Sequence, residues 1–559
     1  MSNRRCVALA SNFLSLAMLA TLAACGGGGG SSTAATSPTT PSTPSTPTGP
    51  STPASGTDVV TYKNDALRTG QNVTESVLTT ANVNSSTFGL LRNLQVDGKV
   101  DAQPLYLSKL TVAATSHNVV FIATENNSVY GVDSDSGTTL WKVSLNGSGE
   151  TPSDTHGCFQ VVPQIGITAT PVIDRAAGAH GTIFVMAMTK DASGNYHQRL
   201  HALDVTTGAE QTNSPKEISA TYMSTTFAPG QYEERAALLL LNGVIYTTFT
   251  SHCDDAPYGG WVMAYSESTL AQTAVLNVAP NASGSGNANQ GPAIWMSGGG
   301  PAADSAGNVY LLTANGLFDT NLNGSGFPSG GDYGNSFLKI STSGGALAVA
   351  DYFALDNGVA DSQNDVDLGS GGIMLLPDQT DATGTVRHLA VGAGKDGNLY
   401  VVSRDSLGKF SASANNIYQE LDGSLSGGVW ATAAWFNGSI YYGPNGNKLM
   451  AFSVTNAQVS SSAVSQSATQ FGYPGTSPVV SANGTANGIV WAYENPGSGP
   501  AVLHAYDATN LAKELYNSNQ AANGRDQFGA GNKFIAPTVA DGKVFVATTT
   551  SVGVFGLLP

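Results

Sequence analysis

"VYGVDSDSGTTLWKV", residues 129–143, contains a short apolar strand, a polar turn and a second strand. Asp133 ends the first strand, Gly137 closes the turn and Trp141 lies in the second strand. Asp side chains bond the amides of such turns, and Gly accepts the positive φ that they require. The stretch therefore predicts a tight turn between antiparallel strands, with Trp141 directed toward the next structural unit.

The first five residues of this stretch recur along the chain. Their counterparts are "LHALD" (200–204), "VMAYS" (262–266), "FLKIS" (337–341), "LYVVS" (399–403), "LMAFS" (449–453), "LHAYD" (503–507) and "VGVFG" (552–556). Upstream of each copy comes a β-branched and aromatic strand, such as "VVFIAT" (119–124), and before that a strand of smaller residues. Four short strands repeated eight times predict an all-β fold, an eight-bladed β-propeller of four-stranded antiparallel blades.

The last of these repeats lacks a fourth strand. The segment "FGLLRNLQV" (88–96), ahead of the first complete unit, can supply it. An unpaired edge would otherwise invite association with other chains. We therefore expect an N-terminal strand to close the ring.

The beginning of the chain has a different composition from the rest. Residues 1–24 combine Arg4 and Arg5 with an apolar stretch, which predicts an export signal. The closing "LAAC" resembles a bacterial lipobox, which implies cleavage before Cys25 and acylation of its thiol; the alternative is an ordinary signal peptide with an incidental Cys. Residues 25–57, rich in Gly, Ser, Thr and Pro, predict an extended tether. We expect residues 58–559 to form the propeller, lipid-anchored in the bacterial cell envelope, at the outer membrane.

The overall charge narrows the choice of partners. The chain of 559 residues has 23 basic and 39 acidic side chains, a net charge of −16. Nucleic acid is excluded as a partner, because phosphate binding needs a basic face. The low charged fraction of 11% and the 66 glycines suit an exported β-rich protein.

Two cysteines remain in the predicted propeller, Cys158 and Cys253. Both fall in loops on one face of the disc, and the envelope is oxidising. We expect a disulfide between them, the alternative being two free buried thiols.

The same face collects the candidate functional residues. In a four-stranded blade, the link into the inner strand and the hairpin between the second and third strands lie on one side of the disc. Polar and aromatic residues fall in these loops: Asp254, Trp295, Asn315, Asp365 and Lys395. Such a set predicts a pocket for a polar, ring-shaped ligand.

The repeat resembles the tryptophan-docking repeat of the pyrroloquinoline quinone (PQQ) type propellers, A-x-D-x-x-T-G-x-x-x-W, best in residues 129–143. The resemblance to these quinoprotein alcohol dehydrogenase-like propellers implies sites for PQQ and calcium. It implies that Trp295 stacks under the quinone, that Lys395 contacts it and that Asp365 is the catalytic base. Asn315 and Asp365 would bind calcium, and Asp254 lies in the hairpin where the family carries a calcium-binding Glu.

The sequence also departs from that family. A vicinal Cys-Cys pair is absent, Asn364 stands where a Trp precedes the catalytic Asp, and no C-x-x-C-H haem motif occurs. Whether the chain is an enzyme therefore stays open. The first interpretation is a lipid-anchored binding or scaffolding module for an envelope protein or a small polar ligand, similar to the PQQ-like propeller lipoproteins of the outer-membrane assembly type. The alternative is a PQQ- and calcium-dependent oxidoreductase acting on an alcohol or sugar.

Overall fold

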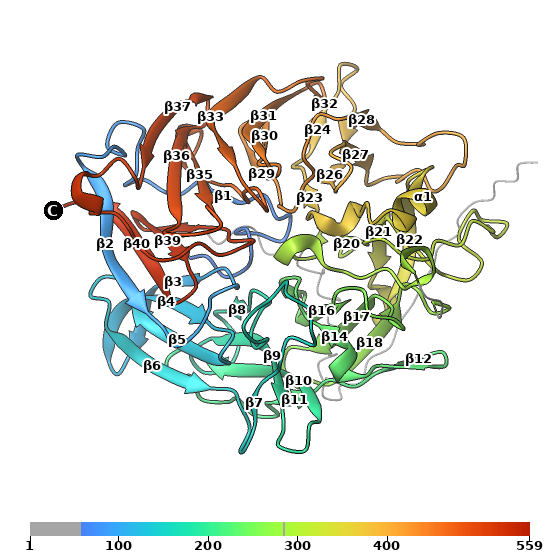
Figure 1. The fold of residues 1–559 in the computed structure, drawn as a ribbon, viewed down its shortest axis with the longest axis horizontal. Helices are drawn as coiled ribbons and strands as arrows, with labels where there is room; N and C mark the ends of the chain where they lie inside the picture. Colours follow the sequence, from blue (N-terminus) through green and yellow to red (C-terminus); the bar gives the residue numbers. More distant parts are fainter. Residues whose placement is uncertain (1–57, 283–285) are drawn as a thin grey trace, which may run out of the picture. The chain divides into compact units, whose positions relative to one another are not determined.

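Eight small sheets follow one another around a central axis in the computed structural model, which describes residues 58–282 and 286–559 (Figure 1). The predicted export signal, the predicted lipidation site Cys25 and the predicted tether lie outside the described residues. The predicted eight-bladed propeller is confirmed. We number the blades in chain order and give their strands from the inside outward.

The first four blades are built from consecutive strands. Blade 1 comprises β3 (Leu105–Val112), β4 (Thr115–Ala123), β5 (Ser128–Asp133) and β6 (Thr139–Ser144). Blade 2 comprises β8 (Val172–Asp174), β9 (Thr182–Lys190), β10 (Tyr196–Asp204) and β11 (Lys216–Glu217), with β7 (Thr151–Pro152) also on β9. In blade 3, β14 (Tyr232–Glu233) and β15 (Leu239–Leu241) share β16 (Val244–Ser251), followed by β17 (Trp261–Ser266) and β18 (Gln272–Asn277). Blade 4 comprises β19 (Ala302–Ala303), β20 (Val309–Leu312), β21 (Ser336–Ser341) and β22 (Ala348–Ala354).

The last four blades complete the ring. Blade 5 comprises β23 (Met374–Leu375), β26 (Leu389–Ala393), β27 (Leu399–Ser403) and β28 (Gln419–Leu421). Blade 6 comprises β29 (Ala434–Phe436), β30 (Ser439–Tyr442), β31 (Asn447–Thr455), β32 (Gln458–Val459) and β33 (Ser465–Phe471). Blade 7 comprises β1 (Gln71–Asn72), β34 (Val479–Asn483), β35 (Ala486–Glu494), β36 (Val502–Asp507) and β37 (Asn510–Asn517). Blade 8 comprises β38 (Thr538–Ala540), β39 (Lys543–Ala547), β40 (Ser551–Leu557) and β2 (Phe88–Gln95).

Short elements decorate the loops. Two hairpins stand apart from the blades, β12 (Thr221–Tyr222) with β13 (Thr225–Thr226) and β24 (Gln379–Thr380) with β25 (Val386–Arg387). The helices are α1 (Gly358–Gln363), η1 (Pro229–Gln231), η2 (Asn287–Asn289), η3 (Met296–Gly298), η4 (Ser343–Gly345), η5 (Leu368–Ser370) and η6 (Ala522–Gly524). Within the described residues, no helix has the length and apolar character to cross a bilayer.

Each repeat identified in the sequence forms the third strand of a blade, and in blade 1 it is β5. The turn after it forms as expected, because Asp133 Oδ1 accepts the amide of Ser136 at 2.6 Å and Gly137 has φ 79°. Trp141 Nε1 then donates to the Val205 carbonyl of blade 2 at 3.0 Å. The Trp141 ring also packs closely on Gly208, where a Cβ would come within 2.6 Å of it. The tryptophan therefore joins neighbouring blades as predicted.

The ring is closed by β2, as the sequence predicted. β2 pairs antiparallel with β40, so the blue N-terminal strand completes the red C-terminal blade (Figure 1). Phe88 is fully buried there, with its ring centroid 5.0 Å from Tyr516, 5.4 Å from Trp491 and 6.3 Å from Phe555. Closure thus rests on strand pairing and on an aromatic cluster shared by blades 7 and 8.

A second closure was not predicted. Residues 58–75, the inner ring segment, run around the axis and contact all eight blades. Backbone hydrogen bonds of 2.8–2.9 Å pair Val59 with Tyr106, Val60 with Ile173, Ala66 with Ala303, Leu67 with Leu375, Thr69 with Trp435 and Gly70 with Val480. Arg68 Nη2 donates to Leu238 of blade 3 at 3.1 Å, and Asn72 Nδ2 donates to Val539 of blade 8 at 2.9 Å. The segment therefore ties the inner strands together.

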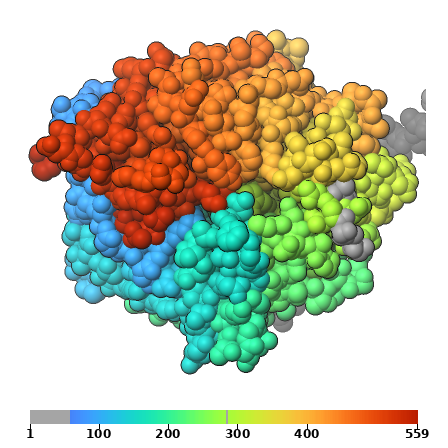
Figure 2. Space-filling model, in the orientation of Figure 1, coloured from blue at the N-terminus to red at the C-terminus, as the bar shows by residue number. Residues whose placement is uncertain are grey.

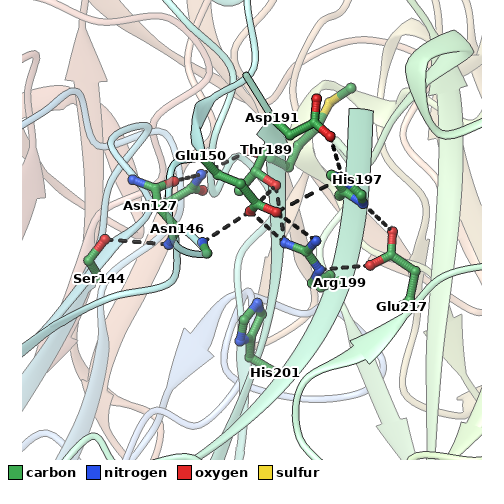
Figure 3. A network of polar contacts seen from close by, with 12 residues as sticks. Asn127, Ser144, Asn146, Glu150, Thr189, Asp191, His197, Arg199, His201 and Glu217 are labelled. Carbon is green, nitrogen blue, oxygen red and sulfur yellow. Dashed lines mark hydrogen bonds and ion pairs between the residues drawn. The ribbon is translucent and has the colours of Figure 1, made fainter. Parts of the chain in front are cut away.

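An ion-pair network fixes the chain where it enters blade 2. Arg199 lies between Glu150 and Glu217, at 2.7 Å from a carboxylate oxygen of each (Figure 3). His197 Nδ1 lies 3.0 Å from the same Glu217. The hydrogen bonds from Arg199 lower the pKa of Glu150 to about 2. The network holds the start of the loop that crosses the face described next.

Candidate functional site

The predicted site residues meet at one cavity. It has a volume of 270 Å³, and its walls come from the loops of blades 2 to 7 on the face where inner-strand links and second hairpins meet. We call it the site cavity. Its walls include all five candidates from the sequence: Asp254, Trp295, Asn315, Asp365 and Lys395. The structure therefore brings these residues together, while their roles toward a cofactor or metal stay predictions.

Lys395 is the charged centre of this group. Its Nζ lies 2.7 Å from Asp365 Oδ1 and 2.7 Å from Asp367 Oδ2. Burial disfavours the ammonium form, but the two carboxylates outweigh it and raise the pKa of Lys395. Asn315 completes the arrangement, because its Nδ2 donates to Asp365 at 2.9 Å and its backbone amide to Asp367 at 2.7 Å.

The two aspartates differ in their surroundings. The Asp365 side chain is 56% exposed, whereas that of Asp367 is 13% exposed. Burial raises the pKa of Asp367 to about 6, although Lys395 acts in the opposite direction. Asp365 is therefore the more accessible hydrogen-bond acceptor in the cavity, whereas the more buried Asp367 pairs with the Lys395 ammonium.

A third carboxyl group, Asp254, closes the blade 3 side. Its Oδ1 accepts from Ser251 Oγ at 3.1 Å and from Tyr258 OH at 2.9 Å. Burial raises its pKa above the ordinary value, despite these two hydrogen bonds. Asp254 and Asp365 both have φ 57°, a conformation that non-glycine residues rarely adopt. Such backbone strain is concentrated at functional sites.

Aromatic rings surround the polar group. Trp295 is T-shaped to Phe534 at 5.7 Å, and Trp430 is T-shaped to Tyr473 at 5.5 Å. Trp295 Nε1 donates to Ser297 Oγ at 3.2 Å, which fixes its ring at the start of η3. The cavity thus offers flat apolar faces beside a cluster of charged groups.

Two charged residues, Arg235 and Glu233, lie at the wall of the site cavity. The Arg235 guanidinium lies 5.7 Å from the Trp295 ring and 5.2 Å from that of Phe534. Its Nε and Nη2 are buried without a hydrogen-bond partner. Glu233 lines the cavity, and burial raises its pKa to about 7, with Arg235 opposing the shift. Sequence reasoning missed both residues, although "YEERA" (232–236) places three charges together in a sparsely charged chain.

The predicted disulfide is confirmed. Cys158 and Cys253 are bonded, and both line the site cavity. The bond joins the loop entering blade 2 to the hairpin of blade 3. It therefore forms a covalent part of the cavity wall.

The carboxylates of the site cavity are already engaged by donors of the protein. Within residues 58–282 and 286–559, no three His, Cys, Asp or Glu side chains are grouped so that they could hold a metal. Asp365 and Asp367 share the Lys395 ammonium, and Asp254 accepts two hydroxyl donors. A calcium ion would require Lys395 to move away from these carboxylates.

Solved structures place this architecture among known folds. The quinohemoprotein alcohol dehydrogenase of Comamonas testosteroni superposes with a TM-score of 0.61 at 14% identity, over 90% of this chain and 81% of that one. A europium-containing methanol dehydrogenase superposes with a TM-score of 0.57 at 16% identity, over 89% of this chain and 90% of that one. The chain has the PQQ-like β-propeller fold. No family model matches this PQQ-like propeller, and no curated protein does.

The similarity of the PQQ-like propeller to BamB from Moraxella catarrhalis is weaker, with a TM-score of 0.45 at 13% identity over 84% of this chain and 97% of that one. At these identities the likeness concerns the fold alone, because one propeller architecture supports many functions. The function of the PQQ-like propeller must therefore be argued from its own residues.

Proposed function

We propose that the chain is an envelope-anchored propeller that binds a small, planar, polar ligand in the site cavity. The observation that carries this proposal is the convergence of Lys395, Asp365 and Asn315 beside Trp295 in one cavity. Asn315 comes from a loop of blade 4, whereas Asp365 and Lys395 come from two different loops of blade 5, so segments far apart in the sequence meet at this group. Concave sites with flat apolar walls and a few fixed polar groups are typical of ligand binding.

The chemistry of the site indicates the ligand class. Lys395 and Asn315 supply donors, Asp365 supplies an exposed acceptor, and the rings of Trp295 and Trp430 supply surfaces for stacking. A ring with carbonyl, hydroxyl or amino substituents in its plane would use both sets of contacts. A volume of 270 Å³ limits the ligand to a small molecule.

A second candidate is a PQQ-dependent oxidoreductase acting on an alcohol or sugar. It is favoured by the meeting of Trp295, Asn315, Asp365 and Lys395, the residues that the family resemblance implied. The calcium part does not fit the present donor set, since the Lys395 ammonium occupies the space between the two carboxylates. We therefore rank ligand binding first and derive no reaction step through a quinone or a metal.

The membrane anchor is part of the same proposal. Cys25 would carry the lipid, and residues 25–57 would hold the propeller away from the outer membrane, where it would meet an envelope protein or its ligand. Labelling with a radioactive fatty acid tests this. The wild-type chain should be labelled and fractionate with membranes, and a Cys25→Ser variant should do neither. A wild-type chain without label would contradict the anchor.

Native mass spectrometry tests the binding proposal. The full chain, purified from its own envelope, should carry a small-molecule adduct. A Lys395→Met variant should lose the adduct, whereas Lys513→Met, which changes an exposed lysine, should keep it. Wild-type protein without any adduct, or an adduct unaffected by Lys395→Met, would overturn the proposal.

The same purified chain separates the two candidates. After dialysis it is titrated with PQQ, with and without Ca²⁺, while the tryptophan fluorescence and dye reduction by alcohols and sugars are followed. Binding without turnover supports the first candidate. Turnover that requires Ca²⁺ and disappears in Asp365→Ala would replace it by the second.

A further inference from the structure

The loop entering blade 2 crosses the face of the propeller. We call residues 153–165 the strap. Its disulfide at Cys158 fixes it to blade 3, and Gln164 Nε2 donates to the Glu125 carbonyl of blade 1 at 2.9 Å. On its far side, Lys533 Nζ lies 3.4 Å from the Phe159 carbonyl. Figure 2 shows this teal segment reaching the red C-terminal blades across the middle of the face.

The strap divides the mouth of the propeller into two hollows. The site cavity lies on one side of it. On the other side lies a larger hollow of 820 Å³, which we call the groove. Its walls are Val162 to Gln164 of the strap, Asn495 to Gly497 of blade 7, and Gly531 to Lys533 at the entry to blade 8. Tyr473 borders both hollows, so they are neighbours.

Among the polar residues that line the groove, uncharged side chains outnumber charged ones. Side-chain amides come from four separate loops: Asn126, Gln164, Asn495 and Asn532. Hydroxyl groups come from Thr549, Thr550 and Tyr473, and flat apolar surfaces from Pro163 and Pro496. Each amide has two N–H donors and an acceptor oxygen in one plane. Some of these are used within the protein: Asn126 Nδ2 donates to Asp97 at 2.9 Å, Gln164 Nε2 to the Glu125 carbonyl at 2.9 Å, and Asn532 Nδ2 to the Val100 carbonyl at 3.0 Å. A ligand would use the N–H groups and oxygens that remain.

The charges at the groove largely cancel. Asp97 Oδ2 lies 2.9 Å from Lys142 Nζ, and Lys99 Nζ lies 2.9 Å from Asp101 Oδ2. Lys533 is turned toward the strap, where Gln160 Oε1 also lies 3.3 Å from its Nζ. An ionic ligand would therefore find no concentrated opposite charge.

The lining of the groove includes a buried carboxyl group. Glu125 is 1% exposed, and its Oε2 accepts the Gly166 amide at 2.6 Å and the Thr168 hydroxyl at 3.0 Å. Burial, together with the neighbouring Asp101, raises the pKa of Glu125 well above its ordinary range. Burial therefore disfavours the ionised form of this carboxyl group, which lies beside the uncharged amides of the groove.

We propose that the groove binds a short neutral oligosaccharide. Sugar rings present adjacent hydroxyl groups that pair with planar amides, and their C–H faces lie against tyrosine and proline rings. The groove supplies amides on several sides, a tyrosine and two prolines around a volume of 820 Å³. A peptide added as a β-strand would require an unpaired strand edge, and the walls of the groove are loops. This inference is independent of the ligand proposed for the site cavity.

Saturation-transfer NMR tests the inference on the purified full chain. Maltotriose, cellotriose and chitotriose are supplied separately at millimolar concentrations, with trialanine as the peptide probe. We expect saturation transfer to at least one trisaccharide and none to trialanine. Transfer to trialanine alone, or to none of the four probes, would overturn the proposal.

Matched variants test whether the trisaccharide binds in the groove. Asn495→Ala and Gln164→Ala should each weaken the trisaccharide by about tenfold, because one hydrogen bond of about 1.4 kcal/mol is lost. Asn519→Ala, an exposed amide outside the groove, should leave affinity unchanged. Lys395→Met should also leave it unchanged, which separates this site from the site cavity. Equal affinity in the wild type and both groove variants would contradict the assignment.

Discussion

Lys395 Nζ is equidistant from two carboxylates, 2.7 Å from Asp365 Oδ1 and 2.7 Å from Asp367 Oδ2. The buried Asp367 depends on this ammonium, since burial alone favours its neutral form. A Lys395→Met variant should raise the pKa of Asp367 from about 6 by more than about one unit. Carboxyl ¹³C NMR titration measures the shift. An unchanged Asp367 titration in the variant would show that the pair is not formed in solution.

The disulfide between Cys158 and Cys253 should stabilise both the ring and the strap. A Cys158→Ser/Cys253→Ser variant should lose about 2–4 kcal/mol in the free energy of unfolding, as typical for a long closed loop. The strap, residues 153–165, should then become the first site of limited proteolysis. Denaturant unfolding and digestion with a broad-specificity protease measure both effects. Identical digestion patterns with and without the disulfide would show that this bond does not hold the strap in place.

Because β2 closes the ring, replacing Phe88 should strongly lower the free energy of unfolding. A Phe88→Ala variant removes a fully buried ring from the cluster with Tyr516 and Trp491, which should cost about 3–5 kcal/mol. Weaker packing of β2 against β40 should also expose this edge more often and promote aggregation. The matched control is Phe159→Ala, whose ring is 76% exposed and which should change stability by less than about 0.5 kcal/mol. Similar losses in the two variants would argue against closure by this strand.

The buried carboxyl groups predict an acidic optimum of stability. Glu233 and Asp367 have folded-state pKa values of about 7 and about 6, above their unfolded values, so the folded state binds protons first and stability falls as pH rises from about 4 toward 7. Glu150 and Asp97 have values of about 2, so their stabilisation is present above pH 4 and is lost as pH falls toward 2. The melting temperature should therefore peak near pH 4–5. A Glu233→Gln variant should flatten the decline between pH 5 and 7, and a peak above pH 7 would contradict this balance.

The architecture was accessible from the sequence because each blade repeats one local pattern. The "VYGVD" copies mark the third strands, and Trp141 donates to blade 2 as its position in the turn repeat suggested. The inner ring segment, by contrast, could not be predicted from the sequence. Its core, "YKNDALRTGQN" (62–72), lacks any strand periodicity, because its partners are backbone groups of blades distributed over the whole chain. Such pairing leaves no local signal.

The site was predictable only as far as it follows the blade repeat. Asp254, Asn315 and Lys395 could be assigned to one face because each follows a recognisable second strand. The support of Asp254 by Tyr258 and the position of Arg235 behind Trp295 could not, since both depend on irregular loops and a divided inner strand. The groove combines four loops from different blades, so its amides have no common spacing in the sequence.

The most direct test of the ligand-binding proposal is a crystal structure of the full chain purified from the cells that naturally produce it. We predict ordered density for a planar molecule in the site cavity, stacked on Trp295 and within hydrogen-bond distance of Lys395 or Asn315. A cavity that holds only water molecules, in protein that has never been dialysed or denatured, would contradict the proposal.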